Sequence, residues 1–353
     1  MIRRVLRRRE SRSFSPWRRV RSPERVLLIR LHAIGDVAVT LPAAKGLRLR
    51  YPEATIDALT RAEIVPLLRS FSIFDTVLEC PEAAHPADRF ALAARLGVQI
   101  RDKEYDVIID LQRNWATRLV RMIASPKAWG EFDRFSSAPA SQRVLDTFER
   151  SGFDGLSPSF DLPVSSSLRE EALEMLQSRG YDGERKLVLL NPAGLWRTRQ
   201  WPLEHYVALA RRWLDREPVR FLLLGTERIR EQSRVISGAL GCDAINFAGE
   251  TSLTLAVAML QMTSAVITED SGLMHLAWSC GIPVVALFGS SRHIWSAPTG
   301  SRVVVFHSGD LPCGQCMEPV CRFGDVHCLA RRTPATVLEA AMELASHDVP
   351  EVR

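Results

Sequence analysis

Short apolar segments alternate with longer amphipathic segments along most of the chain. Arg25–Leu31 reads Arg-Val-Leu-Leu-Ile-Arg-Leu, a nearly continuous apolar run typical of a parallel sheet buried on both faces. After a polar turn, Val37–Arg50 has the length and composition of a helix. Further strands are expected at Thr55–Leu59, Thr76–Leu78, Val107–Asp110, Ala128–Phe132, Leu187–Asn191, Val219–Leu224, Ala244–Phe247, Ala265–Thr268, Val284–Phe288 and Val303–Phe306. Further helices are expected at Ala62–Ser70, Ala83–Ile100 with a break near Gly97, Trp115–Ala124, Ser141–Arg150, Leu168–Arg179, Leu203–Asp215, Glu227–Leu240, Leu253–Met262 and Pro334–Ser346. This alternation predicts an α/β fold with doubly wound parallel sheets.

The segment Ser151–Ser167 interrupts the alternation, because it is rich in Gly, Ser, Pro and Asp. A chain of 353 residues is also long for a single domain. We therefore expect two Rossmann-like domains that face each other across a cleft, at residues 26–160 and 168–353. A basic arm at 1–25 precedes the first domain, and the second contains a Cys-rich loop at 312–328 and a C-terminal helix.

The stretch 265–289 has the pattern of a buried strand, a polar turn, a short helix and a second buried strand. Asp270 or Ser271 can cap the helix, which leaves the amides of Ser271, Gly272 and Leu273 without partners in its first turn. Free amides at the positive end of a helix dipole bind anions, and Gly272 lets a phosphate approach the backbone closely. The turn also lies at the carboxyl end of a strand, where ligands of open α/β sheets bind. The alternatives are a diphosphate site and an ordinary capped turn.

Three common phosphate-binding patterns are absent. The sequence has no Gly-x-Gly, no Gly-x4-Gly-Lys-Ser/Thr and no Asp-x-Asp, so the dinucleotide fingerprint, the P-loop and the obvious ligands of a metal-bound diphosphate are missing. Amides and side-chain cations must therefore balance the charge of any diphosphate. Arg197 and Arg199, in the loop Asn191–Pro202, can chelate phosphate oxygens, and Ala193 and Gly194 leave room at the backbone. The alternative is that both arginines are solvated at the surface.

The net charge of +5 is unevenly distributed. Residues 1–25 contain ten Arg and two Glu, a net charge of +8, so the rest of the chain carries −3. A slightly acidic body is a poor nucleic-acid binder, and we expect no nucleic-acid partner. The Arg-rich N-terminus also contains apolar residues, which favours either an anionic membrane surface or a solvated tail. No apolar run reaches the about 18–20 residues that span a bilayer. No signal-peptide core follows the arginines, so we expect a cytoplasmic protein.

Four of the seven cysteines lie close together, as Cys313-x2-Cys316-x4-Cys321-x6-Cys328. Four thiolates can hold a structural zinc ion tetrahedrally, with His327 as an alternate ligand. The spacing differs from that of common zinc fingers, so reduced or redox-labile thiols are the alternative. Stable disulfides are not expected in this compartment.

Three motifs in order along the chain resemble glycosyltransferase family 9, the lipopolysaccharide heptosyltransferases. They are Ile34-Gly35-Asp36-Val37 with Thr40-Leu41-Pro42, Asn191-Pro192-Ala193-Gly194 through Arg199-Gln200-Trp201-Pro202, and Glu269-Asp270-Ser271-Gly272-Leu273-Met274-His275. The cysteines followed by Thr333-Pro334-Ala335 are also similar to members of that family. The resemblance covers residues 25–345. It implies a GT-B fold, with the acceptor in the N-terminal half and an ADP-sugar in the C-terminal half.

The resemblance further implies metal-independent, inverting transfer of a heptose or related sugar to a lipid A–core glycolipid acceptor. The reaction would take place on the cytoplasmic side of the inner membrane, with the enzyme peripheral to it and with no cofactor. By position, Asp36 matches the family's catalytic aspartate, which would accept the proton of the acceptor hydroxyl. Gly35 and Arg113 are assigned to the acceptor side. Without the resemblance, Asp36 is interpreted as a helix cap and Arg113 as part of an exposed helix face.

On the donor side, the resemblance assigns the leaving diphosphate to Arg199 and to the amides of Ser271 and Gly272, because negative charge grows on the diphosphate as its bond to the sugar breaks. His275 would also reach the phosphates, unless it is a packed core histidine. Asp270 would cap the turn or contact the nucleotide. Glu231 would hold the ribose.

Some residues depart from the family pattern. Arg199 stands where Lys is usual, which keeps the charge but changes its geometry, and Ser271 stands where Thr is common. His32-Ala33 replaces small hydroxyl residues beside the acceptor, so the identity of the acceptor stays open. Two alternatives come from other classes: a sugar-nucleotide epimerase or hydrolase of GT-B type, and a non-catalytic paralogue that only binds a nucleotide sugar or glycolipid.

Overall fold

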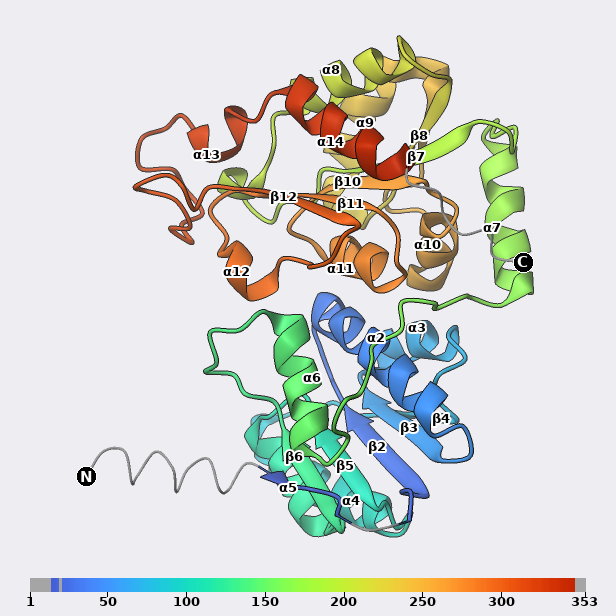
Figure 1. Ribbon diagram of the computed structural model, residues 1–353, viewed down its shortest axis with the longest axis vertical. Coiled ribbons are helices and arrows are strands. Elements are labelled where there is room, and N and C mark those ends of the chain that lie inside the picture. The colour runs from blue at the N-terminus through green and yellow to red at the C-terminus, as the bar shows by residue number, and fades with distance from the viewer. Residues whose placement is uncertain (1–13, 19–20, 347–353) are drawn as a thin grey trace. The chain divides into compact units, whose positions relative to one another are not determined.

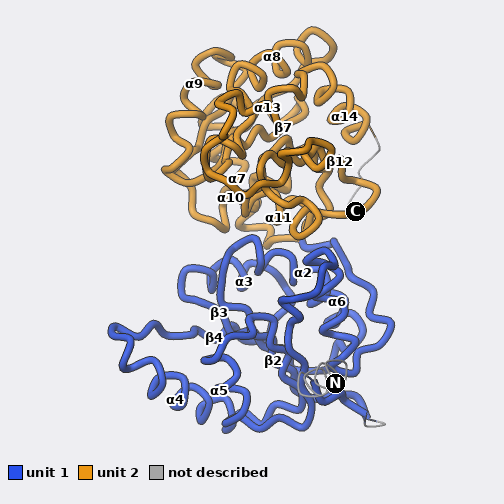
Figure 2. Tube along the Cα trace, turned by 90° about the vertical axis from the view of Figure 1, so that its left-hand side faces the viewer, with its two compact units in different colours: residues 1–162 blue, residues 163–353 orange. Residues whose placement is uncertain are grey.

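The computed structural model describes residues 14–18 and 21–346 (Figure 1). The chain divides into two compact units, residues 1–162 and 163–353, each built around its own six-stranded sheet (Figure 2). The division falls inside the Gly-, Ser- and Pro-rich segment 151–167. Within the described residues, no helix combines the length and the apolar character that crossing a bilayer requires.

The sheet of unit 1 has the strand order β1-β6-β5-β2-β3-β4. Its strands are β1 (Phe14–Ser15), β2 (Arg25–Ile29), β3 (Thr55–Thr60), β4 (Thr76–Glu79), β5 (Val107–Asp110) and β6 (Ala128–Glu131). The strands β2 to β6 pair in parallel, and the apolar residues of β2 are buried, as the uninterrupted apolar run predicts.

β1 lies within the predicted arm and pairs antiparallel with β6, with Phe14 opposite Gly130. The Trp17 amide also donates to the Ser151 carbonyl over 2.8 Å. Part of the segment expected to be a free arm is therefore an edge strand of the sheet. A two-residue strand has no periodicity that the sequence could reveal. The remainder of the Arg-rich N-terminus lies largely outside the described residues.

The helices of unit 1 pack in two groups. They are α2 (Ile34–Arg50), α3 (Val65–Arg69), α4 (Arg89–Arg101), α5 (Trp115–Ala124) and α6 (Ala140–Arg150). α2 contacts α6, whereas α4 contacts α5 and covers a cluster of buried residues that includes Leu27, Ile108 and Val120. The predicted break near Gly97 is wrong, because α4 continues through it. A Cβ at Gly97 would lie 2.8 Å from Cβ of Ile123, so the glycine allows α4 and α5 to approach closely.

The sheet of unit 2 has the strand order β12-β11-β10-β7-β8-β9, and all of these pairs are parallel. Its strands are β7 (Lys186–Asn191), β8 (Val219–Leu223), β9 (Ala244–Asn246), β10 (Ala265–Glu269), β11 (Val284–Phe288) and β12 (Val303–His307). Its α-helices are α7 (Ser166–Ser178), α8 (Leu203–Leu214), α9 (Arg230–Leu240), α10 (Leu253–Leu260), α11 (Gly272–Ser279), α12 (His293–Ser296), α13 (His327–Ala330) and α14 (Pro334–Ser346). The core joins Trp201, Trp213 and Phe221 to Val337 and Leu338 of α14.

The order of strands reverses once in each sheet. In unit 1 the chain runs from β2 outward to β3 and β4 and then returns to β5 on the other side of β2. In unit 2 it runs from β7 to β8 and β9 and then returns to β10 on the other side of β7. Ligands of open parallel sheets bind at the carboxyl ends of strands beside such a reversal. The loops that follow β2, β5, β7 and β10 are therefore the places where a site is expected.

Candidate active site

The strand ends at the reversal of unit 2 are joined by one buried amide side chain. Asn191, the last residue of β7, donates from Nδ2 to the Leu224 carbonyl over 2.8 Å. Its Oδ1 accepts from Oγ1 of Thr268 over 3.2 Å and from Oγ of Ser271 over 3.1 Å. The ends of β7, β8 and β10 are therefore fixed relative to one another. The sequence places Asn191 at the start of a motif but does not reveal these hydrogen bonds, because the partners follow other strands.

The turn between β10 and α11 has the predicted capping arrangement. Ser271 is the N-cap of α11, and its Oγ accepts from the Met274 amide over 3.3 Å. Gly272 and Leu273 occupy the first helical turn, where backbone amides have no intrahelical acceptor. Gly272 and Leu273 are only half-buried, so an anion can reach their amides at the positive end of the helix. This turn is therefore suited to bind a phosphate group.

Glu269 fastens the loop after β7 to the end of β10. Its carboxylate is buried and accepts hydrogen bonds from the backbone amides of Gly194 and Trp201, the latter over 2.6 Å. Burial raises the pKa of Glu269 to about 8. The sequence predicts open space at Gly194, and this is wrong. A Cβ there would lie 2.6 Å from the Arg199 carbonyl oxygen and 2.8 Å from Oε2 of Glu269, so protein atoms fill the space.

The fastened loop brings Arg199 to the β10–α11 turn. Nη1 of Arg199 lies 3.3 Å from Oδ2 of Asp270, and both side chains are largely buried. The guanidinium stacks over the ring of Trp196, 4.0 Å from its centroid. Arg199 and Asp270 thus meet as the two motifs suggested. Arg197 is exposed and lines a cavity of about 350 Å³ together with Gln232 and Glu269.

The two remaining donor-side predictions have different surroundings. His275 is buried in α11, and its carbonyl accepts from Oγ of Ser279 over 2.8 Å. Glu231 is exposed on α9, and hydrogen bonds from Arg234 lower the pKa of its carboxyl. A basic residue that the sequence did not single out, Arg228, donates to the Ala193 carbonyl over 3.0 Å and so reaches the fastened loop.

In unit 1, Asp36 lies in the first turn of α2, beside the strand reversal. Its Oδ2 is 2.8 Å from Nη2 of Arg30 and accepts from the Ala33 amide over 3.3 Å. Among the described residues, Oδ1 has no hydrogen-bond partner, and the Asp36 side chain is 53% exposed, against 12% for Arg30. Burial lowers the pKa of Arg30, although Asp36 counteracts this. The carboxylate is therefore held at one oxygen by a buried cation and open to solvent at the other.

Arg113 follows β5 but belongs to a network of charges. Its Nη1 donates to the Phe132 carbonyl over 2.9 Å, and its Nε lies 3.5 Å from the buried carboxylate of Glu131. Glu131 also pairs with Arg118 at 2.7 Å and with Arg121 at 2.5 Å. The guanidinium predicted to meet the acceptor is therefore engaged in holding the ends of β5 and β6. Gly35, beside Asp36, is half-buried in the first turn of α2.

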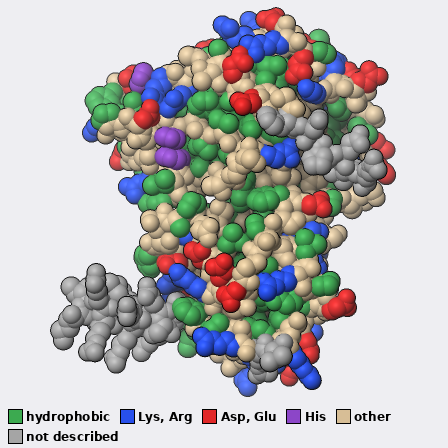
Figure 3. Space-filling model, viewed as in Figure 1, with side chains coloured by type: hydrophobic (Ala, Val, Ile, Leu, Met, Phe, Trp, Pro, Cys, Tyr) green, Lys and Arg blue, Asp and Glu red, His purple; other side chains and the backbone are tan. Residues whose placement is uncertain are grey.

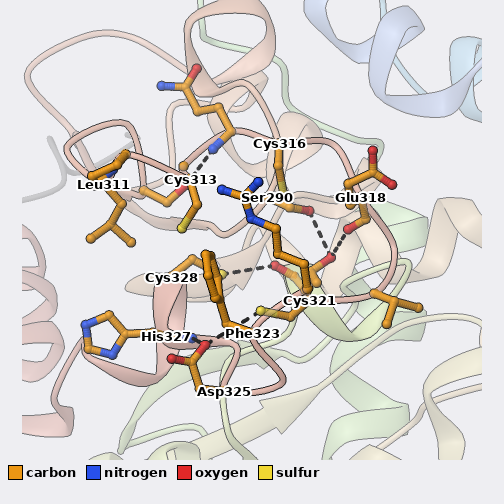
Figure 4. A pocket seen from close by; sticks show the side chains of 17 residues that line it. Ser290, Leu311, Cys313, Cys316, Glu318, Cys321, Phe323, Asp325, His327 and Cys328 are labelled. Carbon is orange, nitrogen blue, oxygen red and sulfur yellow. Dashed lines mark hydrogen bonds between the residues drawn. The ribbon is translucent and has the colours of Figure 1, made fainter.

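The four clustered cysteines line one cavity of about 450 Å³, together with Phe323 and Asp325 (Figure 4). They are Cys313, Cys316, Cys321 and Cys328, and all are free thiols. Sγ of Cys328 donates to the Thr198 carbonyl over 3.5 Å, and Sγ of Cys321 to Oδ1 of Asp325 over 3.6 Å.

Among the described residues, which include these cysteines, no three His, Cys, Asp or Glu side chains are grouped so that they could hold a metal ion. The zinc prediction stays a prediction. The two thiols with hydrogen-bond partners are directed toward a backbone carbonyl and a carboxylate. Metal analysis of the purified native protein tests the zinc prediction.

Two Rossmann-like units, each with its candidate residues at the strand reversal, define a GT-B glycosyltransferase fold. The sequence model of glycosyltransferase family 9 (heptosyltransferase) matches residues 93–327, and the chain belongs to this family. The chain is 28% identical over 306 residues to lipopolysaccharide heptosyltransferase 2 of Salmonella typhimurium, covering 80% of this chain and 87% of that protein.

Solved structures agree with the fold. The structure of E. coli ADP-heptose lps heptosyltransferase II is 24% identical, with a TM-score of 0.72 and coverage of 91% of this chain and 98% of that one. E. coli heptosyltransferase WaaC with ADP is 18% identical, with a TM-score of 0.65 and coverage of 91% and 99%. The fold class and the family predicted from the motifs are confirmed, and the protein is a glycosyltransferase.

Proposed function

We propose that this protein transfers a heptose, or a related sugar, from an ADP-sugar to a lipopolysaccharide inner-core or related envelope-glycan acceptor, with inversion at the anomeric carbon. Membership of family 9 and the names of the curated relatives support the reaction class and the acceptor. A related structure that holds ADP supports the donor. The observation that carries the proposal is the pairing of Arg199 with the β10–α11 turn at the strand reversal of unit 2.

The donor diphosphate is assigned to unit 2. When the bond between the anomeric carbon and the diphosphate oxygen breaks, its electron pair stays with ADP, and the added negative charge needs stabilisation. Arg199 and the amides of Gly272 and Leu273 supply it. At 3.3 Å the contact between Arg199 and Asp270 is long, so a phosphate oxygen can replace the carboxylate as a partner of the guanidinium. His275 and Glu231 stay assigned to the phosphates and the ribose, as expected from the family pattern.

The acceptor is assigned to unit 1, with Asp36 as the general base. Oδ1 of Asp36 accepts the proton of the acceptor hydroxyl while the hydroxyl oxygen forms its bond to the anomeric carbon. Attack from the face opposite the departing ADP inverts the configuration. Arg30 is a positioning residue in this scheme, because its contact with Oδ2 fixes the carboxylate and leaves Oδ1 for the substrate. No cofactor takes part in these steps. The acceptor lies on the cytoplasmic side of the inner membrane, where the enzyme is peripheral.

Incubation of the purified full chain with ADP-heptose and a delipidated inner-core acceptor tests the proposal. We expect glycosyl transfer of unchanged rate after treatment with EDTA, and a product of inverted anomeric configuration by NMR. Breakdown of the donor without transfer would favour the epimerase or hydrolase alternative. Binding of ADP-heptose without turnover would favour the non-catalytic alternative. A product of retained configuration would contradict the role of Asp36 as a base.

A further inference from the structure

Two adjacent helices of unit 1 expose an unusual combination of side chains. α4 and α5 pack against each other on one face of the sheet, and both figures of the backbone show them side by side (Figures 1 and 2). The two helices contain five arginines and no acidic residue. We define the α4–α5 face by their exposed charged and large apolar residues, which are Arg89, Phe90, Arg95, Val98, Arg101, Trp115, Arg118 and Met122.

The apolar members of this face are well exposed. Phe90 is 63%, Val98 51%, Trp115 52% and Met122 69% exposed, so each keeps much of its apolar surface in water. A single exposed apolar residue is common on protein surfaces, but four on two touching helices form a patch of the kind that marks an interaction site. Removing this surface from water is favourable in proportion to the apolar area that is buried. The patch therefore favours a partner with an apolar interior.

Most of the arginines of the α4–α5 face have no side-chain partner within the part of the chain that the structure describes. Among the described residues, Arg89, Arg95 and Arg101 form no hydrogen bond or ion pair, whereas Arg118 pairs with Glu131. The nearest acidic residues in sequence, Asp88 and Asp102, flank α4 without belonging to it. Figure 3 shows basic, acidic and hydrophobic side chains interspersed over the end of unit 1 where α4 and α5 lie. Since residues 26–353 together carry a net charge of −3, this basicity is local.

We propose that the α4–α5 face docks on an anionic lipid bilayer. Aromatic and aliphatic side chains that project from a basic helical surface insert at the level of the headgroups, while the arginines meet the lipid phosphates. The charge of the face complements anionic headgroups, and its exposed apolar residues match the acyl boundary. The surface belongs to the folded unit and is distinct from the Arg-rich N-terminus. The inference rests on the proposed function in one respect: the proposed acceptor is a glycolipid of the membrane, so docking would bring the enzyme to it.

Co-sedimentation of the full chain with vesicles tests this proposal. We expect binding to phosphatidylglycerol-rich vesicles and little binding to pure phosphatidylcholine. Each basic residue near an anionic surface strengthens binding about fivefold, so the triple variant R89Q/R95Q/R101Q should bind about 100-fold more weakly. The matched control R169Q/R212Q/R322Q removes the same charge from exposed positions of unit 2 and should lose only a fewfold. Circular dichroism of each variant checks that it is folded.

A second pair of variants tests the apolar contribution. F90S/M122S should weaken binding to the anionic vesicles and leave its salt dependence unchanged, because no charge is removed. V235S/I294S alters exposed apolar residues of unit 2 and should bind like the wild type. Neutralising Arg7, Arg8 and Arg9 measures the contribution of the N-terminus separately.

The proposal is wrong if R89Q/R95Q/R101Q binds as tightly as its control, or if neutralising the N-terminus alone accounts for the binding. Equal binding to phosphatidylcholine would also contradict it. Binding of the face to an acidic soluble protein in the absence of vesicle binding would identify a protein partner instead. Because the vesicles contain no donor and no acceptor, failure of this test leaves the proposed transfer reaction untouched. Failure of the transfer assay likewise leaves the vesicle result intact.

Discussion

The two strand reversals share one topology, but they are held by different interactions. In unit 2, hydrogen bonds to Asn191 and Glu269 join the strand ends, and most of these bonds involve backbone groups or neutral side chains. In unit 1, ion pairs dominate, with Arg30 on Asp36 and three arginines around Glu131. This difference in interactions fits the proposed roles, in which unit 2 binds the donor diphosphate and unit 1 holds the general base.

An incoming diphosphate brings its own negative charge, so the site in unit 2 offers amides and an arginine with a replaceable partner. A general base needs a fixed carboxylate, and in unit 1 the ion pair with Arg30 orients the carboxylate of Asp36. In the proposed function, the same sheet topology therefore serves either purpose, and the side chains at the strand ends decide which.

The largest effect is expected for Asp36→Asn. General bases contribute about 10²- to 10⁴-fold to rates, so transfer should fall by that amount while the affinity for ADP in unit 2 stays constant. Steady-state kinetics and ADP titration measure the two quantities, and the exposed Asp154→Asn is the control. Wild-type turnover of Asp36→Asn would contradict the role of unit 1 as the source of the general base.

A smaller effect is expected for Arg199→Gln, which takes away the cation of the unit 2 site. Hydrogen bonds to charged groups contribute about 1.5–3 kcal/mol, so the Kd for ADP should rise roughly 10- to 100-fold. Arg197→Gln is the matched control from the same loop, because Arg197 is exposed and lines a cavity that includes neither Arg199 nor Asp270. Isothermal titration of both variants gives the comparison. Equal losses in the two would show that net charge, and not the geometry at Asp270, binds the nucleotide.

The fastening of the loop in unit 2 is tested by Gly194→Ala. The added Cβ has no space between Arg199 and Glu269, and overpacking of this kind costs about 1–3 kcal/mol of the free energy of unfolding. Gly238→Ala is the control, because its Cβ would meet no atom within 4 Å and alanine favours the helix by up to about 1 kcal/mol. Urea denaturation should therefore move the two midpoints in opposite directions.

Glu269 should also make the stability of unit 2 depend on pH. Because its pKa is raised to about 8 from an ordinary value of 4.5, the native state binds this proton more tightly than the unfolded state. Its contribution to stability is complete below pH 4.5 and is lost as the pH rises through about 8. Glu269→Gln should be less stable throughout, since its amide offers one acceptor oxygen where Glu269 accepts from two backbone amides, but should show a shallower decline between these pH values. An unchanged slope would mean that Glu269 does not titrate in this range.

Much of the fold and the family could be predicted from the sequence. The apolar runs identified the central strands, because a strand buried on both faces has almost no other composition. The motifs around Asp36, Asn191 and Asp270 identified the family. The polar residues before a helical segment predicted a cap at Asp270 or Ser271, and Ser271 is the N-cap. These features are local, so a single stretch of chain contains all the information they require.

The tertiary structure alone decided which distant segments pair with one another. The space beside Gly194 is filled by Glu269, 75 residues away, and Arg113 is engaged by the buried Glu131. The arginine that holds Asp36 and the strand formed by Phe14 depend likewise on where neighbouring strands end. A side chain's freedom to meet a ligand depends on which groups the fold brings to it. Its own sequence neighbours do not contain that information, because hydrogen bonds and ion pairs form in space.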